Sequence, residues 1–198
     1  MGIAMNEKIK DLLDRISDIE DEIEDILNEK REHVLYIYKD GKIKFKKDIE
    51  DAHKKMKVTL FRFFLDSEIR NIMSAPFIYS MIFPFVIIDI TITIYQLICF
   101  SLYRVKKVKR SAYIIIDRHH LNHLNSIERL NCIYCGYANG VISYAMEVAA
   151  RTEQYWCPIK HARKVIGRHS RYYDFLDFGE ADKYQDHLQE YRRKLAER

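Results

Sequence analysis

The 198-residue sequence is long enough for one ordinary domain, or for one small domain with attached parts. It contains only 3 prolines and 6 glycines, which argues against long disordered linkers and favours helix throughout. The formal net charge of +4 is unevenly spread, because residues 1–33 carry a net charge of −6 and residues 104–118 one of +5. The basic block follows the most apolar stretch of the chain. An anionic membrane surface is therefore expected as its partner, and nucleic acid is not.

Residues 1–33 show a heptad repeat of apolar side chains. Charged residues fill the other positions, so the apolar residues form one narrow stripe, and isoleucine at both seam positions tends to favour more than two strands. We therefore predict a coiled-coil helix that forms a homo-oligomer through residues 9–26, with the number of chains left open. The alternative is an amphipathic helix that packs on its own domain. The seam consists of Ile9, Leu12, Ile16, Ile19, Ile23 and Ile26.

Residues 34–73 are expected to form a short β-hairpin and an amphipathic helix. Two β-prone runs flank Asp40-Gly41, a dipeptide typical of tight hairpin turns. An isolated hairpin is marginally stable, so this one should pack on another part of the protein. Residues 48–73 return to helical spacing of apolar residues.

Residues 74–104 are predicted to form a membrane segment. From Phe77 to Tyr103 the only charged residue is Asp89. A helix of that length measures about 40 Å, more than the roughly 30 Å hydrocarbon core of a bilayer. Pro84 should kink this helix, because proline has no backbone N–H to donate. An unpaired carboxylate is costly in lipid, so Asp89 should face a protein or water-filled interior.

The sequence leaves the topology of this segment open between a single span and a re-entrant helical hairpin that turns near Pro84 or Asp89. The basic residues 104–110 place the C-terminal side in the cytoplasm by the positive-inside rule. The first residues show no basic region followed by an apolar core, so no signal peptide is expected. The predicted location is the inner (cytoplasmic) membrane, with the C-terminal domain on the cytoplasmic side.

Residues 105–167 are predicted to form a small helical metal-binding domain, with helices at 117–131 and 141–156. Four residues with the spacing C-x2-C-x21-C-x3-H supply the ligands of a closed tetrahedral zinc site. Gly136 would let the backbone turn after the second cysteine. Iron in a rubredoxin-like site is the alternative metal, and ordinary reduced cysteines or a redox pair are the alternatives to a metal. The proposed ligands are Cys132, Cys135, Cys157 and His161.

A histidine cluster precedes the first cysteine pair. On a helix, His119 and His123 would share a face, and His120 would lie one turn from His123. With a nearby carboxylate such as Glu153, these residues are candidates for a second metal or a catalytic site. The alternative is a set of buried hydrogen bonds and ion pairs. Residues 168–198 should form a connector and a polar C-terminal helix.

Three motifs, DRHHLNHLN, NCIYCGYANG and RTEQYWCPIKHA, lie between residues 113 and 164. Through them the chain resembles an uncharacterised group of small bacterial membrane proteins. The resemblance covers the end of the membrane segment and the predicted metal domain. It implies no particular activity.

These features predict a mainly α protein: a membrane-attached oligomeric scaffold or accessory protein with a structural zinc site. Its zinc domain is a candidate binding surface for a protein partner. A membrane-bound metalloenzyme or redox carrier that uses the histidine cluster is one alternative. An oligomeric pore with Asp89 facing its axis is another.

Overall fold

The computed structural model describes residues 2–34, 36–39, 42–45, 47–65, 67–182 and 184–197, and it is mainly α-helical. The chain divides into two compact units. The N-terminal unit is Met1–Val58 with His120–His123, and the C-terminal unit is Thr59–His119 with Leu124–Arg198.

The N-terminal unit begins with helix α1 (Gly2–Val34). Strands β1 (Tyr36–Lys39) and β2 (Lys42–Phe45) then pair antiparallel, with Tyr36 opposite Phe45, and helix α2 (Lys47–Lys55) follows. The Asp40-Gly41 turn and the side chain of Ile9 lie outside the described residues. The other five seam residues of α1 each expose 46–55% of their surface. They are Leu12, Ile16, Ile19, Ile23 and Ile26.

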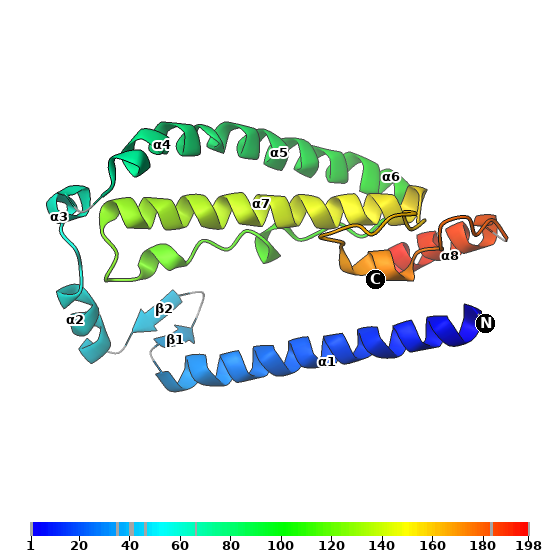
Figure 1. Ribbon diagram of the computed structural model, residues 1–198, viewed down its shortest axis with the longest axis horizontal. Helices are drawn as coiled ribbons and strands as arrows, with labels where there is room; N and C mark the ends of the chain where they lie inside the picture. Colours follow the sequence, from blue (N-terminus) through cyan, green and yellow to red (C-terminus); the bar gives the residue numbers. More distant parts are fainter. Residues whose placement is uncertain are drawn as a thin grey trace. The chain divides into compact units, whose positions relative to one another are not determined.

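The C-terminal unit contains one long apolar helical run after helix α3 (Leu60–Leu65). It comprises α4 (Ile69–Ser80), α5 (Ile82–Tyr95), a π-helical turn (Gln96–Phe100) and α6 (Ser101–Tyr103). The run is long and apolar enough to cross a membrane, judged by length and composition. The run continues in one direction from α4 to α6 (Figure 1), so the alternative of a re-entrant hairpin that turns within it is wrong. The α-helix is interrupted at Met81, because Pro84 has no N–H for the carbonyl of Ser80.

After this run the chain turns back on itself. Arg104 adopts a left-handed conformation with φ of 58°, and residues 104–119, here named the strap, return alongside the helices. The strap is irregular apart from two 3-10 turns, Arg110–Ala112 and Arg118–His120. Helix α7 (Ser126–Trp156) then runs beside the apolar run in the same direction (Figure 1). It begins at a capping box in which Asn125 and Glu128 bond each other's backbone N–H groups.

The prediction of two helices separated by a turn near Gly136 is wrong, because α7 is continuous. Both glycines in its middle serve close packing instead of a turn. A Cβ on Gly140 would lie 2.8 Å from the Cα of Ile114, and one on Gly136 would lie 3.1 Å from the carbonyl oxygen of Ile115. Only a residue without a side chain lets the strap approach α7 this closely.

The core of the C-terminal unit lies where the end of the apolar run, the strap, α7 and the last helix meet. After a 3-10 helix (Ser170–Asp174), helix α8 (Tyr184–Glu197) packs against α7. The apolar run contributes through its inner face only, because most of its large side chains remain exposed. The central buried side chains are Phe100, Val105, Val108, Tyr144, Val148 and Leu195.

Candidate functional site

Asp89 lies buried on the inner face of the apolar run, with 7% of its surface exposed. Arg110 of the strap donates to it through Nε at 2.8 Å, and through Nη2 to the other carboxylate oxygen. The hydroxyl of Tyr137 on α7 donates to Asp89 at 2.9 Å. This confirms the expectation that Asp89 faces a protein interior. Since that interior is the chain's own, the pore hypothesis loses its motivating residue.

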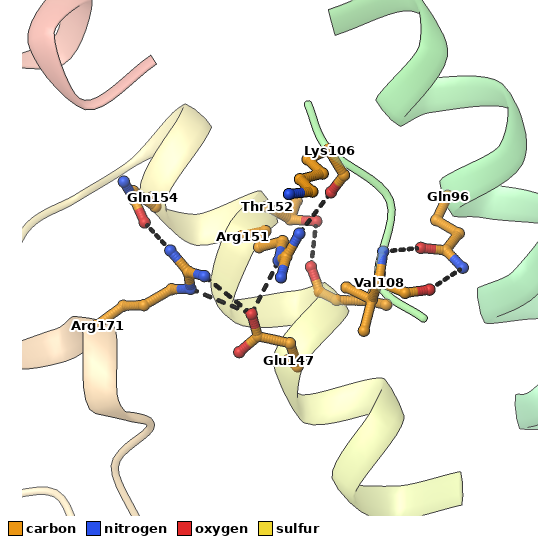
Figure 2. Close-up of polar contacts among 9 residues, drawn as sticks. Gln96, Lys106, Val108, Glu147, Arg151, Thr152, Gln154 and Arg171 are labelled. Carbon is orange, nitrogen blue, oxygen red and sulfur yellow. Dashed lines mark hydrogen bonds and ion pairs between the residues drawn. The ribbon is translucent and has the colours of Figure 1, made fainter. Parts of the chain in front are cut away.

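Gln96, about two helical turns beyond Asp89, joins the apolar run to the strap backbone. Its side-chain amide donates to the carbonyl of Val108 at 3.2 Å and accepts from the N–H of Val108 at 2.9 Å (Figure 2). Tyr144 of α7 also contacts the amide of Gln96. The glutamine thus satisfies both backbone groups of a strap residue that has no helix or sheet partner.

Glu147 forms the centre of a third polar cluster, on α7 (Figure 2). It accepts from Nε of Arg151 at 2.8 Å and from Nη2 of Arg171 at 2.9 Å. Arg151 also donates to the carbonyl of Lys106 in the strap, and Arg171 to the side chain of Gln154. Burial by itself would raise the pKa of Glu147, but hydrogen bonds from the two arginines hold that pKa below its ordinary value. The carboxylate therefore stays ionised and joins α7 to both neighbouring segments.

These contacts are all internal. Each cluster joins α7 to the strap, to the apolar run or to the segment around Arg171, and the charged groups in them are largely satisfied by one another. Such networks stabilise one arrangement of the backbone, because any other arrangement would leave a buried polar group without its hydrogen-bond partner. The geometry therefore supports a structural role, in which these side chains hold α7, the strap and the apolar run in place.

The predicted metal ligands do not come together. Cys132 and Cys135 lie on α7, whereas Cys157 follows its last residue. Cys157 is 22 positions after Cys135, which corresponds to about 33 Å along a helix, while two thiolates on one zinc ion lie about 4 Å apart. Within the described residues, no group of three or more His, Cys, Asp or Glu side chains is arranged to hold a metal ion. The four-ligand shell does not fit this fold, and the binding of zinc or iron by other means stays a prediction.

The fourth predicted ligand and Glu153 lie near the C-terminal end of α7. The ring of His161 stacks against that of Tyr172, with centroids 5.9 Å apart. Glu153 pairs with His169, whose Nε2 lies 2.8 Å from the carboxylate. His169 did not stand out in the sequence, because it lies 16 positions after Glu153 and outside the helix that carries Glu153.

The histidine cluster does not form one helical face. Only Arg118–His120 is helical, as a single 3-10 turn, so the spacing of His119 and His123 does not place them on one side. His120 and His123 belong to the N-terminal unit, where the ring of His123 packs edge-on against that of His53 at 5.2 Å. The helical face expected of these histidines is therefore not formed, and a metal or catalytic role for them stays a prediction.

The polar residues on the inner face of the apolar run could be recognised from their spacing in the sequence. Asp89, Thr93 and Gln96 are spaced as successive turns on one side of a helix. Thr93 contacts the hydroxyl of Tyr144 at 3.3 Å, so all three face α7 or the strap. Their partners, Arg110 and Tyr144, could not be matched to them by local spacing.

No protein-family model, no curated protein and no solved structure matches this chain. The resemblance to small bacterial membrane proteins therefore stays a prediction. Functional inference rests on the geometry of the chain itself.

Proposed function

We propose that this protein is a membrane-attached oligomeric scaffold, which holds its C-terminal unit at the cytoplasmic face of the inner membrane. The observation that carries the proposal is the division of the apolar run into two faces. One face is pinned by Asp89 and Gln96 to the strap and α7, and the other exposes large apolar side chains. A soluble protein rarely leaves such a continuous apolar surface in water.

The exposed face extends along the whole run. Ile69, Phe77 and Leu102 each expose more than 70% of their surface, and further exposed residues lie at helical spacing between them. Among the latter are Phe83, Ile87, Ile90, Ile94 and Ile98. From Phe77 to Leu102 the only charged residue is Asp89, which lies on the inner face. Contact with lipid hydrocarbon accounts for its composition better than contact with water does.

Self-association is proposed to occur through α1. Its seam is narrow, and the described seam residues are half exposed in the single chain. Pairing such a stripe with identical stripes would bury it, which is the arrangement of a coiled coil. An oligomer would also place several membrane-binding faces in one assembly, which strengthens attachment without new contacts.

Fractionation of cells tests the membrane attachment. The protein should sediment with membranes and resist a high-salt wash, since attachment is mainly apolar. The variant Ile87→Asp/Ile90→Asp/Ile94→Asp should shift to the soluble fraction and keep its helical circular dichroism, because those residues do not pack in the core. Ile16→Asp/Ile23→Asp is the matched control and should remain with the membrane. Unmodified protein in the soluble fraction would contradict the proposal.

A further inference from the structure

The strap limits the orientations that the apolar run can adopt in a membrane. It contacts the inner face of the run near the middle, with Val108 beside Gln96 and Arg110 beside Asp89. Strap residues at this level are open to the surroundings, including Lys109, Ser111 and Ala112. The side chain of Arg110 is itself 45% exposed.

A bilayer that surrounded the run as a plain span would enclose these strap residues in hydrocarbon. Exposed charged side chains are expensive at that depth, and irregular backbone is tolerated only where protein or water covers it. The strap is irregular and charged, and it lies beside the middle of the run. A span therefore conflicts with the contacts that hold the C-terminal unit together.

The length of the run gives a second, independent argument. At 35 residues it measures about 52 Å, against the roughly 30 Å of a hydrocarbon core. Its first turn holds the exposed Arg70, so the apolar part is Phe77–Tyr103, which measures about 40 Å. A span would leave about 10 Å of apolar helix outside the hydrocarbon, whereas a helix lying in the membrane plane has no such limit.

We infer that the run Ile69–Tyr103 lies in the plane of the membrane as a monotopic anchor, with its outer face in the lipid and the strap and α7 on the cytoplasmic side. This rests on the membrane attachment proposed above and specifies its form. The partner is an anionic phospholipid surface. Residues 104–118 carry a net charge of +5, and Lys107 and Lys109 are exposed beside the anchor, within reach of headgroups.

Protease protection of terminal epitope tags separates the in-plane anchor from a span. With the full chain in inverted membrane vesicles, both the N-terminal and the C-terminal tag should be digested. In right-side-out vesicles both tags should be protected. One tag digested in each preparation would overturn the in-plane anchor and leave the proposed membrane attachment intact. Protein recovered outside the membrane fraction would overturn both.

Depth measurements test the same geometry by another route. Single variants Phe77→Trp, Ile90→Trp and Leu102→Trp, reconstituted with lipids brominated at different depths, should all be quenched most by shallow bromines. The quenching of native Trp156 in the unsubstituted protein gives the background. If Ile90→Trp is quenched most by bromines at the bilayer centre and the other two by shallow ones, the run spans and the inference fails.

The lipid charge is tested by flotation with phosphatidylglycerol or phosphatidylcholine vesicles after detergent dilution. Lys107→Glu/Lys109→Glu should weaken association with phosphatidylglycerol by at least about 30-fold, because each lysine contributes roughly 1 kcal/mol and each glutamate adds repulsion. Arg163→Glu/Lys164→Glu, an equal change of charge at exposed residues of the C-terminal segment, is the control and should have a smaller effect. Equal losses in the two variants would overturn the assignment of the strap lysines to the lipid surface.

Discussion

Helix α1 and the apolar run Ile69–Tyr103 both expose isoleucines, but they expose them in different ways. On α1 the apolar residues form a narrow stripe between charged residues, and the described seam residues are half exposed. On the apolar run the outer face is broadly apolar, while the inner face carries Asp89 and Gln96 in buried hydrogen bonds. A narrow apolar stripe can be buried against an identical helix. A broad apolar face can be buried in lipid when the opposite face of its helix is held by protein contacts. Changes to α1 should therefore alter association without altering the folding of the C-terminal unit, and changes to the inner face should alter that folding.

The largest expected effect is on association. In Ile16→Asp/Ile23→Asp, each chain would place two carboxylates in a seam that pairs with identical seams, so the oligomer should dissociate completely. Light scattering in mild detergent measures the mass, and thermal unfolding should be unchanged for the C-terminal unit. An unaltered oligomer would assign self-association to another surface. Asp21→Ala, on the exposed side of α1, is the matched control.

The next effect is on folding, at the inner face of the run. Asp89→Ala leaves the part-buried hydroxyl of Tyr137 and the guanidinium of Arg110 without their acceptor, and should cost about 2–3 kcal/mol of unfolding free energy. Because the side chain of Arg110 is partly exposed, the loss of unfolding free energy should lie at the low end of the range for breaking a buried ion pair. Denaturant unfolding in detergent measures it. Asp89→Leu/Arg110→Leu should recover part of the loss, and equal losses in both variants would argue against the pair.

A pH dependence should follow from Glu147. Because the folded state holds its pKa below the ordinary value of 4.5, its contribution to stability is present above that value. The contribution is lost as the pH falls below 4.5 through the lower folded pKa. Glu147→Gln should cost about 2 kcal/mol at pH 7 and flatten the fall in stability below pH 4.5. Unchanged acid sensitivity in the variant would show that other carboxylates are responsible.

A smaller loss is expected at the glycine beneath the strap. Gly140→Ala places a Cβ 2.8 Å from backbone atoms of Tyr113 and Ile114, which cannot move aside cheaply. The overpacking should outweigh the gain in helix propensity and leave a net loss of about 1 kcal/mol. Thermal unfolding against Ser143→Ala, an exposed change on the same helix, measures the difference. Stabilisation by Gly140→Ala would mean that the strap does not pack here.

The smallest effect is expected at the cysteine pair. Since α7 holds Cys132 and Cys135 far from Cys157, Cys132→Ser/Cys135→Ser should change the free energy of unfolding by less than about 0.5 kcal/mol. Elemental analysis of the unsubstituted protein provides the companion measurement. Zinc at one ion per chain that is lost in this variant, together with unfolding on chelation, would restore the four-ligand site and contradict the continuous helix.

Much of the architecture was readable because it depends on local patterns. The apolar run, the buried position of Asp89 and the helical N-terminus follow from hydropathy and periodicity within one segment. The error at α7 arose from a local pattern with two physical meanings. Gly136 after a Cys-x2-Cys pair suits a metal knuckle, and it suits equally a helix that another backbone crosses closely. Only the position of Ile115 distinguishes the two.

The sequence by itself determined that this protein is mainly helical, has a long apolar segment and carries a narrow isoleucine seam, since each property belongs to the periodicity of contiguous residues. The tertiary structure decided which polar residues meet: Arg110 with Asp89, Val108 with Gln96, and Arg171 with Glu147. These pairs join segments 12 to 24 residues apart, and the return of the strap brings the first two together. No spacing rule encodes a contact made by an irregular segment that folds back, because its geometry is fixed by packing and not by a repeating backbone.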